Sequence, residues 1–336
     1  MNRRQFHLTA FARAFGVMAG IAAGTAGALH APAAQADTWP SKPVTVIVPF
    51  PAGGGTDAFA RPLTAQLSKQ LGKQFIIDNR GGAGGTVGAS IAAKAAPDGY
   101  TLFVGGAHHA IAPSFYKKLD YDIEKDFIPI TVIAQPPQVV VVNPVKVQAN
   151  TLKELIAYAK ANPGKLNYGS AGNGSSHHLA GELFKLQTQT FITHIPYKGA
   201  GPALSDLIAG QVDMVFDGLG SSAQHIRAGR IKALAVASKT RSAAFPNVPT
   251  AAEAGVPGYE VSTWYALWVP KGTPKEVVDK LYAETTKALN SPEMKQIWLQ
   301  NGSETPVFTP DQFAQFEHAE IKRWADVVQR SGAKID

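Results

Sequence analysis

The residues of this chain best placed to do chemistry begin in a glycine-rich stretch that follows a short β-branched run. Val44–Val48 has the composition of a strand buried on both faces. Gly53–Gly55 can adopt backbone angles that a Cβ disfavours, and Thr56 or Asp57 can then cap a helix that continues to Leu71. Such an arrangement aims free backbone N–H groups at one point, where the helix dipole also favours negative charge. The stretch predicts a site for a small anion, although a turn without a ligand would have the same sequence.

The glycine loops do not fit a nucleotide site. The first one lacks the Gly-Lys-Ser/Thr of a phosphate-cradling loop, and the second, Gly81–Gly88, lacks the Gly-x-Gly-x-x-Gly spacing of dinucleotide-binding folds. A carboxylate is therefore the favoured anion.

The same arrangement of a strand, a glycine-containing loop and a helix start recurs in the middle of the chain. Leu166–Ser170 is a predicted strand, Ala171–His178 a stretch rich in Gly, Ser and Asn that ends in two histidines, and a helix follows with leucines on one face. A second anion-binding loop is therefore expected here, with His177 as a candidate donor to a ligand carboxylate. His108 follows another predicted strand, Thr101–Val104, and is expected to line the same cleft.

Metal binding and catalysis are not predicted. His178 and Glu182 have helical i, i+4 spacing, but a zinc site needs three or four converging ligands, and no such cluster is evident. The chain has no Gly-x-Ser-x-Gly elbow and no Ser/His/Asp trio that can be placed from order alone. An exported hydrolase would require an activated Ser175 or Ser176 beside a histidine. We expect no catalytic residue and no cofactor.

Three further residues each have two interpretations. Asp217 ends a predicted strand and either caps the next helix or accepts a hydrogen bond from a ligand amine or hydroxyl. Lys198 is either a solvated loop charge or a counter-ion to a second carboxylate. Trp264 is either a core residue or a flat wall for a planar ligand.

The first 36 residues have the features of an export signal. A positive start containing Arg3 and Arg4 precedes an apolar Ala/Gly-rich run, and Ala34-Gln35-Ala36 predicts cleavage before Asp37. The arginine pair leaves the twin-arginine and general secretory routes both open. Removing this leader takes away three arginines and no acid, so the net charge of +7 falls to +4. No Lys/Arg cluster indicates nucleic-acid binding.

The absence of cysteine limits the remaining possibilities. It excludes disulfides, thiolate chemistry and a lipid-modified N-terminal cysteine. An exported protein without a tether needs an enclosing compartment, so we expect the periplasm of a Gram-negative bacterium.

Strands alternate with helices along the mature chain, which predicts right-handed crossovers and parallel sheets. Two αβ lobes joined by two crossings are expected, with Val139–Val142 and Ser262–Val269 as the crossing and hinge segments. The predicted limits are residues 37–138 plus 259–336 for lobe 1 and residues 139–258 for lobe 2.

Several motifs in the mature chain carry a family likeness. They are Pro49–Asp57 with Arg61, Asn79–Gly85, Asp98–Leu102, Tyr168–Ser170, Gly174–Leu183, Pro196–Gly199, Gly210–Asp213, Ile226–Gly229 and Pro249–Gly255. In this order they resemble the Bug-type receptors, the substrate-binding (TctC-like) component of tripartite tricarboxylate transporters.

The resemblance implies an α/β, two-lobe periplasmic-binding-protein fold (type II-like) with the ligand in a cleft between the lobes. Backbone N–H groups and ordered water at both loops would hold a carboxylate. The predicted ligand-binding residues are Phe50, Ala52, Gly53, Gly54, Gly55, Thr56, Asp57, His108, Ser170, Gly172, Asn173, Gly174, Ser175, Ser176, His177, Asp217 and Trp264. The family often has Trp-x-Gly where this chain has Trp264-Tyr265-Ala266, so the cleft is expected to be reshaped here.

The expected activity is capture of a small organic acid by hinge closure and its delivery to a membrane permease pair. The alternative is that the closed form docks on a periplasmic sensor, such as a sensor kinase. The protein is expected to act as a monomer. A dicarboxylate, a tricarboxylate, an acidic amino acid and an aromatic acid are all compatible with the sequence.

Overall fold

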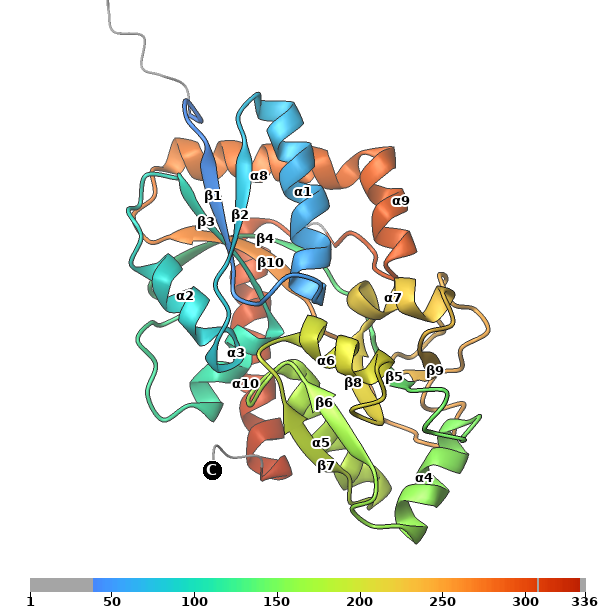
Figure 1. Ribbon diagram of the computed structural model, residues 1–336. Helices are drawn as coiled ribbons and strands as arrows, with labels where there is room; N and C mark the ends of the chain where they lie inside the picture. The colour runs from blue at the N-terminus through green and yellow to red at the C-terminus, as the bar shows by residue number, and fades with distance from the viewer. Residues whose placement is uncertain (1–38, 307, 333–336) are drawn as a thin grey trace, which may run out of the picture. The chain divides into compact units, whose positions relative to one another are not determined.

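The computed structural model describes residues 39–306 and 308–332, and two five-stranded sheets form within this part of the chain (Figure 1). The predicted leader and its cleavage point lie outside the described residues.

The first sheet carries the two glycine loops. Its strand order is β2-β1-β3-β10-β4. Its strands are β1 (Val44–Val48), β2 (Phe75–Asn79), β3 (Thr101–Gly106), β4 (Phe127–Ala134) and β10 (Tyr265–Pro270). Only Thr45 of β1 is partly accessible, as expected of a strand covered on both faces.

The second sheet has the order β7-β6-β8-β5-β9. Its strands are β5 (Gln138–Val142), β6 (Asn167–Ser170), β7 (Thr193–Pro196), β8 (Met214–Gly218) and β9 (Lys232–Val236). Two sheets with their own helices confirm the predicted two-lobe α/β fold. The residue limits of the lobes stay a prediction.

The expected parallel pairing is found among the strands joined by helices, but each sheet also has antiparallel strands. β1, β2 and β3 pair in parallel, as do β6, β7 and β8, but β10 is antiparallel to β3 and β4, and β5 is antiparallel to β8 and β9. β5 and β10 are the strands by which the chain enters a sheet from the other one. The direction of these two strands is therefore set by the connection between the sheets, and not by a strand–helix–strand connection within one sheet.

Helices cover both faces of the first sheet. They are α1 (Gly55–Leu71), α2 (Thr86–Ala93), α3 (Ala107–Phe115), α8 (Lys275–Asn290), α9 (Pro292–Gln300) and α10 (Pro310–Ser331). Residues of α1, α8 and α9 form one hydrophobic cluster with the sheet, and residues of α2, α3 and α10 belong to another. The second cluster continues into the second sheet through Tyr168 and Phe216.

The helices of the second sheet are α4 (Leu152–Ala161), α5 (Ser176–Thr188), α6 (Ala200–Ile208) and α7 (Leu219–Arg227). α10 contacts both α3 and α5 and therefore links the helices of the two sheets (Figure 1). α5 and α10 begin at side-chain caps, from Ser175 and Thr309 respectively, which explains where these helices start.

The two crossings between the sheets run side by side. One consists of Gln135–Pro137 and the other of Ser262–Trp264, and Pro137 pairs with Ser262 in an isolated antiparallel bridge. The predicted crossing Val139–Val142 is misplaced, because it lies within β5, and the predicted Ser262–Val269 extends too far, because Tyr265–Val269 lies within β10. The angle between the sheets can change at these two short crossings with the least disruption of packed side chains.

Among the described residues, no helix is both long enough and apolar enough to cross a membrane.

Candidate functional site

A small pocket lies where segments from both sheets and one crossing meet. Its empty volume is about 270 Å³, and its lining residues are Phe50, Gly54, Gly55, Thr56, His108, Ala171, Ser176, His177, Ala200, Thr263 and Tyr265. Only about 10 Å³ of this space can hold the centre of a water-sized sphere, which is room for about one water molecule. The walls of the pocket therefore nearly meet in this structure.

Four helices present their first turn to the pocket. α1 contributes Gly55 and Thr56, α3 contributes His108, α5 contributes His177 and its neighbour, and α6 contributes Ala200. No side chain caps the N-terminus of α1 or of α6. Because N-terminal N–H groups carry partial positive charge, this convergence favours an anion.

Glycine is required where α1 begins. A Cβ on Gly55 would lie 2.0 Å from the Tyr265 hydroxyl oxygen, and Gly53 has a φ of +86° that side chains disfavour. The close approach of backbone and tyrosine brings the Tyr265 hydroxyl to the start of α1.

Asp57 stabilises this loop through hydrogen bonds. Its carboxylate accepts hydrogen bonds from the Gly53 N–H at 3.1 Å and from the Arg61 guanidinium at 2.7 Å. Asn79 also donates to it, at 3.3 Å. Asp57 thus fixes the loop conformation and does not line the pocket.

The loop after β1 also touches the N-terminal end of α6. A Cβ on Gly201 would lie 2.5 Å from the Ala52 carbonyl oxygen and 3.2 Å from the Gly53 carbonyl carbon. A second contact joins the Tyr116 hydroxyl, which follows α3, to the Asn173 carbonyl of the other loop at 2.8 Å. Each of the two anion-type loops therefore contacts a segment that belongs to the other sheet in this structure.

His108 presents an unsatisfied nitrogen in the pocket wall. It is 4 % exposed, its Nε2 has no hydrogen-bond partner, and the Phe50 ring lies edge-on at 4.6 Å. Burial lowers the His108 pKa well below the usual value, and nearby His109 and His177 lower it further. His108 is therefore a neutral side chain that can donate to a ligand.

His109 lies beneath the pocket and has both ring nitrogens paired. Its Nδ1 accepts from the Gly106 N–H at 3.1 Å, and its Nε2 lies 3.3 Å from the Gly85 carbonyl oxygen. These contacts define the tautomer with a proton on Nε2. Burial lowers the His109 pKa to about 4.

We expect His109 to make the protein acid-sensitive. The unfolded state binds a proton near pH 6.5 and the folded state only near pH 4. The contribution of His109 to the free energy of unfolding is therefore fully present above about pH 6.5. As the pH falls toward 4, protonation of this histidine in the unfolded chain removes about 3 kcal/mol of that free energy. Urea unfolding of wild type and His109→Gln across this range measures the difference. If the variant does not fold, an NMR titration of His109 serves instead, and a midpoint near 6.5 would contradict the expectation.

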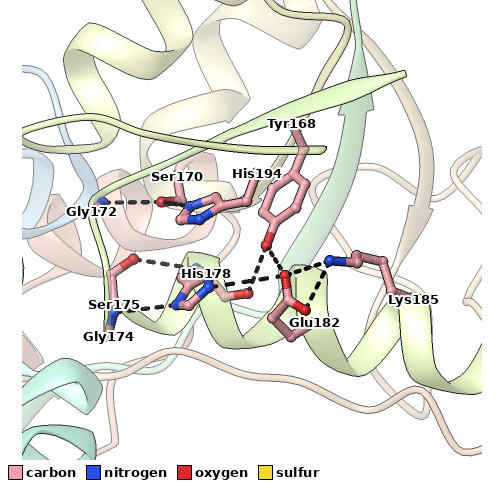
Figure 2. A network of polar contacts seen from close by, with 9 residues as sticks. All are labelled: Tyr168, Ser170, Gly172, Gly174, Ser175, His178, Glu182, Lys185 and His194. Carbon is pink, nitrogen blue, oxygen red and sulfur yellow. Dashed lines mark hydrogen bonds and ion pairs between the residues drawn. The ribbon is translucent and has the colours of Figure 1, made fainter. Parts of the chain in front are cut away.

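The second loop is held by its own polar network, shown in Figure 2. Ser170 Oγ lies 2.6 Å from His194 Nε2 and accepts from the Gly172 N–H at 3.1 Å. The Ser175 hydroxyl accepts from the His178 N–H at 3.2 Å, and His178 Nδ1 accepts from the Gly174 N–H at 3.3 Å. These side chains shape the loop and face away from the pocket lining.

Figure 2 also shows how the network continues along α5. The Tyr168 hydroxyl and the Lys185 ammonium both donate to the Glu182 carboxylate, at 2.7 and 2.8 Å. His178 Nε2 is 3.9 Å from the same carboxylate. In the part of the chain that the structure describes, no three His, Asp or Glu side chains form a group that could hold a metal ion.

Asp217 lies behind the pocket wall and is fully buried. Its Oδ2 accepts hydrogen bonds from the hydroxyls of Ser221 and Ser222, in the first turn of α7. Its Oδ1 lies 3.1 Å from His177 Nε2. Asp217 therefore accepts from side chains of α7 and does not cap the α7 backbone.

Trp264 lies in the core. It is 1 % exposed, packs edge-on against Phe316 at 5.3 Å and donates from Nε1 to Glu320 at 2.8 Å. The extra methyl of Ala266 is also in the core, so of the three residues only Tyr265 reshapes the pocket.

The structure therefore divides the predicted site residues into two groups. Those that line the pocket are Phe50, Gly54, Gly55, Thr56, His108, Ser176 and His177. Those that lie outside its lining are Ala52, Gly53, Asp57, Ser170, Gly172, Asn173, Gly174, Ser175, Asp217 and Trp264. Ala171, Ala200 and Thr263 also line the pocket but were not among the predicted ligand-binding residues, and Tyr265, expected only to reshape the cleft, lies in its wall. Direct contact of any of these residues with a ligand stays a prediction.

Comparison with known proteins gives the family. Residues 59–333 match the family described as "TctC: Tripartite tricarboxylate transporter family receptor". This chain belongs to that receptor family. It is also 41 % identical to the protein BugT of Bordetella pertussis over 318 residues, which is 94 % of this chain and 97 % of BugT. The resemblance to Bug-type, TctC-like receptors is confirmed.

Solved structures of similar proteins contain carboxylates. A protein of R. palustris with adipate has a TM-score of 0.86 and 38 % identity, covering 88 % of this chain and 100 % of that chain. MatC from Rhodopseudomonas palustris with bound malate has a TM-score of 0.82 and 37 % identity, covering 86 % and 100 %.

Proposed function

We propose that this receptor captures a small carboxylate between its two lobes and delivers it to the membrane permease pair of a tripartite tricarboxylate-type transporter. In this proposal it works in the periplasm, after removal of the predicted leader, and carries out no chemical reaction on its ligand.

The observation that carries the proposal is the convergence of four helix N-termini, from both sheets, on one pocket. A ligand that touches the first turns of α1 and α3 and those of α5 and α6 gains full affinity only when the lobes are together. Such a ligand shifts the protein toward the closed form by its extra affinity for that form. The adipate and malate bound by related receptors support a carboxylate as that ligand.

Helix termini alone do not supply enough affinity. Each contributes about 0.3–1 kcal/mol, or up to about 2 kcal/mol when partly buried, whereas a micromolar complex needs about 8 kcal/mol. Pocket donors such as His108, Ser176 and Tyr265, together with bridging water, are expected to supply the remainder.

Calorimetric titration of the mature protein, refolded to remove any carried ligand, tests the proposal. We expect adipate, malate or a related small acid to bind with micromolar or tighter Kd, the matching amide to be inert, and the acid to be recovered unchanged. Binding of the amide as tightly as the acid would contradict the anion site. Unchanged uptake of the acid by cells lacking this protein would contradict the transport role.

A further inference from the structure

The pocket has a buried carboxyl group directly behind its wall. Asp217 is fully buried, and Oδ2 is satisfied by two serine hydroxyls, whereas Oδ1 has no hydrogen-bond partner. The nearest cationic candidate is His177, whose Nε2 lies 3.1 Å from Oδ1, although the contact does not have hydrogen-bond geometry. Among the described residues, no lysine or arginine forms an ion pair with Asp217.

His177 lies between this carboxylate and the pocket. It is 6 % exposed, it lines the pocket, and no described residue forms a hydrogen bond with either of its ring nitrogens. Because Nε2 is the nitrogen beside Asp217, Nδ1 is the one left for a ligand. A neutral imidazole has a single N–H, so it can donate to Asp217 or to a ligand carboxylate, but not to both.

The pocket offers no other full positive charge. No lysine or arginine is among its lining residues, and His108 is held neutral by its surroundings, as shown above. A bound carboxylate and Asp217 are both acceptors only, and a second buried anion is strongly disfavoured without a compensating charge. A proton on His177 supplies that charge and provides both N–H donors.

We propose that carboxylate binding is coupled to uptake of one proton by His177, which then donates from Nε2 to Asp217 and from Nδ1 to the ligand. This inference rests on the proposed function, since it concerns the same pocket. The ligand enters as an anion, one proton enters from solvent, and no covalent bond changes.

Other titratable groups around this pair come from four elements. His108 of α3 faces His177, and Tyr265 of β10 faces Asp217. His225 of α7 also interacts with Asp217, and His178 of α5 is turned toward Glu182. Burial raises the pKa of Tyr265 and Asp217 raises it further, so that the phenol stays protonated and adds no charge.

The test is calorimetric titration with adipate and with malate in two buffers of different ionisation enthalpy, at about pH 8. Both carboxylates of these acids are ionised there. The dependence of the measured enthalpy on the buffer gives the number of protons taken up, which we expect to approach one. Affinity is expected to fall by up to about tenfold for each unit of rising pH. Tight wild-type binding with no proton uptake would overturn the inference and leave the proposed function intact.

Substitutions test which side chain takes up the proton. His177→Gln is expected to abolish proton uptake and the pH dependence of affinity, and Asp217→Asn to reduce uptake while an anion still binds. His225→Gln is the matched control and should retain the uptake of the wild type. Uptake that persists in His177→Gln, or that disappears instead in His108→Gln, would overturn the assignment. Failure of the folded wild type to bind either acid would overturn the proposed function as well.

Discussion

Replacing Gly201 with alanine is expected to weaken ligand binding by about tenfold to a hundredfold while the fold is retained. Gly201 is the second residue of α6, and alanine is a better helix former than glycine. Its new methyl group would lie 2.5 Å from the Ala52 carbonyl oxygen, which belongs to the loop after β1. Because the obstacle is backbone from the other sheet's loop, the lobes would have to separate to relieve it.

A control on the same helix separates closure from helix stability. Ser205 is exposed one turn further along α6, and its hydroxyl donates to the Gly201 carbonyl. Ser205→Ala should keep wild-type affinity. Calorimetry gives the affinities, and small-angle scattering with and without adipate compares the compaction of each variant. If Gly201→Ala binds as tightly as the wild type, the contact between α6 and the β1 loop is not part of the ligand-bound form.

The sequence predicts most elements because their signals are local. β1 is found at its observed limits. α9 also has strong local signals, since Ser291 caps it and Pro292 occupies its first position. These signals need no knowledge of the tertiary structure. The stretch with His108 and His109 is different, because the sequence predicts only that it follows a strand, whereas the structure has α3 there.

α3 shows what local signals cannot supply. Its sequence contains Pro113 and two adjacent histidines, and it follows a pair of glycines, all of which favour a loop. The helix is nevertheless buried, with extensive contact to α10. α10 lies about two hundred residues further along the chain. Packing between distant segments has here overridden a weak local preference.

The position of Tyr265 depends on strand register. Successive side chains of a strand point to opposite faces, so neighbouring aromatic residues at the start of β10 cannot both enter the pocket. Pairing of Tyr265 with Gly106 and Ala134 fixes which one does. Local patterns do not decide that choice, so Trp264 remains open as a core residue or a ligand wall until the structure places it in the core and Tyr265 in the pocket wall.

The polar residues of the two loops illustrate a second limit. Ser170, Ser175 and Asp57 have the side chains expected of a ligand site, and they do lie beside the pocket. Their hydrogen bonds are directed to the loops themselves. Residue type and spacing therefore located both loops, but only the three-dimensional arrangement distinguishes residues that build the loops from residues that line the pocket.

Replacing Glu317 with glutamine is expected to stabilise the protein at alkaline pH by about 5 kcal/mol. Glu317 is 3 % exposed on α10 and accepts from Trp268 Nε1 at 3.2 Å. Burial raises its pKa from 4.5 to about 8, partly offset by the Trp268 hydrogen bond. The folded protein therefore retains a proton that the unfolded chain releases, and stability decreases as the pH rises from 4.5 to about 8.

Glutamine keeps the shape and the acceptor of the protonated acid but does not ionise. The gain from Glu317→Gln in urea unfolding should therefore be small near pH 4.5 and grow until about pH 8. Glu320→Gln, one turn along α10, is the control. Glu320 pairs with Arg323 at 2.6 Å and accepts from Trp264, so its replacement should destabilise the protein throughout this range. A Glu317→Gln gain that does not change with pH would show that Glu317 does not titrate in this window. The effect of desolvation on Glu317, at the interface between α10 and the sheet, would then be smaller than the burial of this side chain implies.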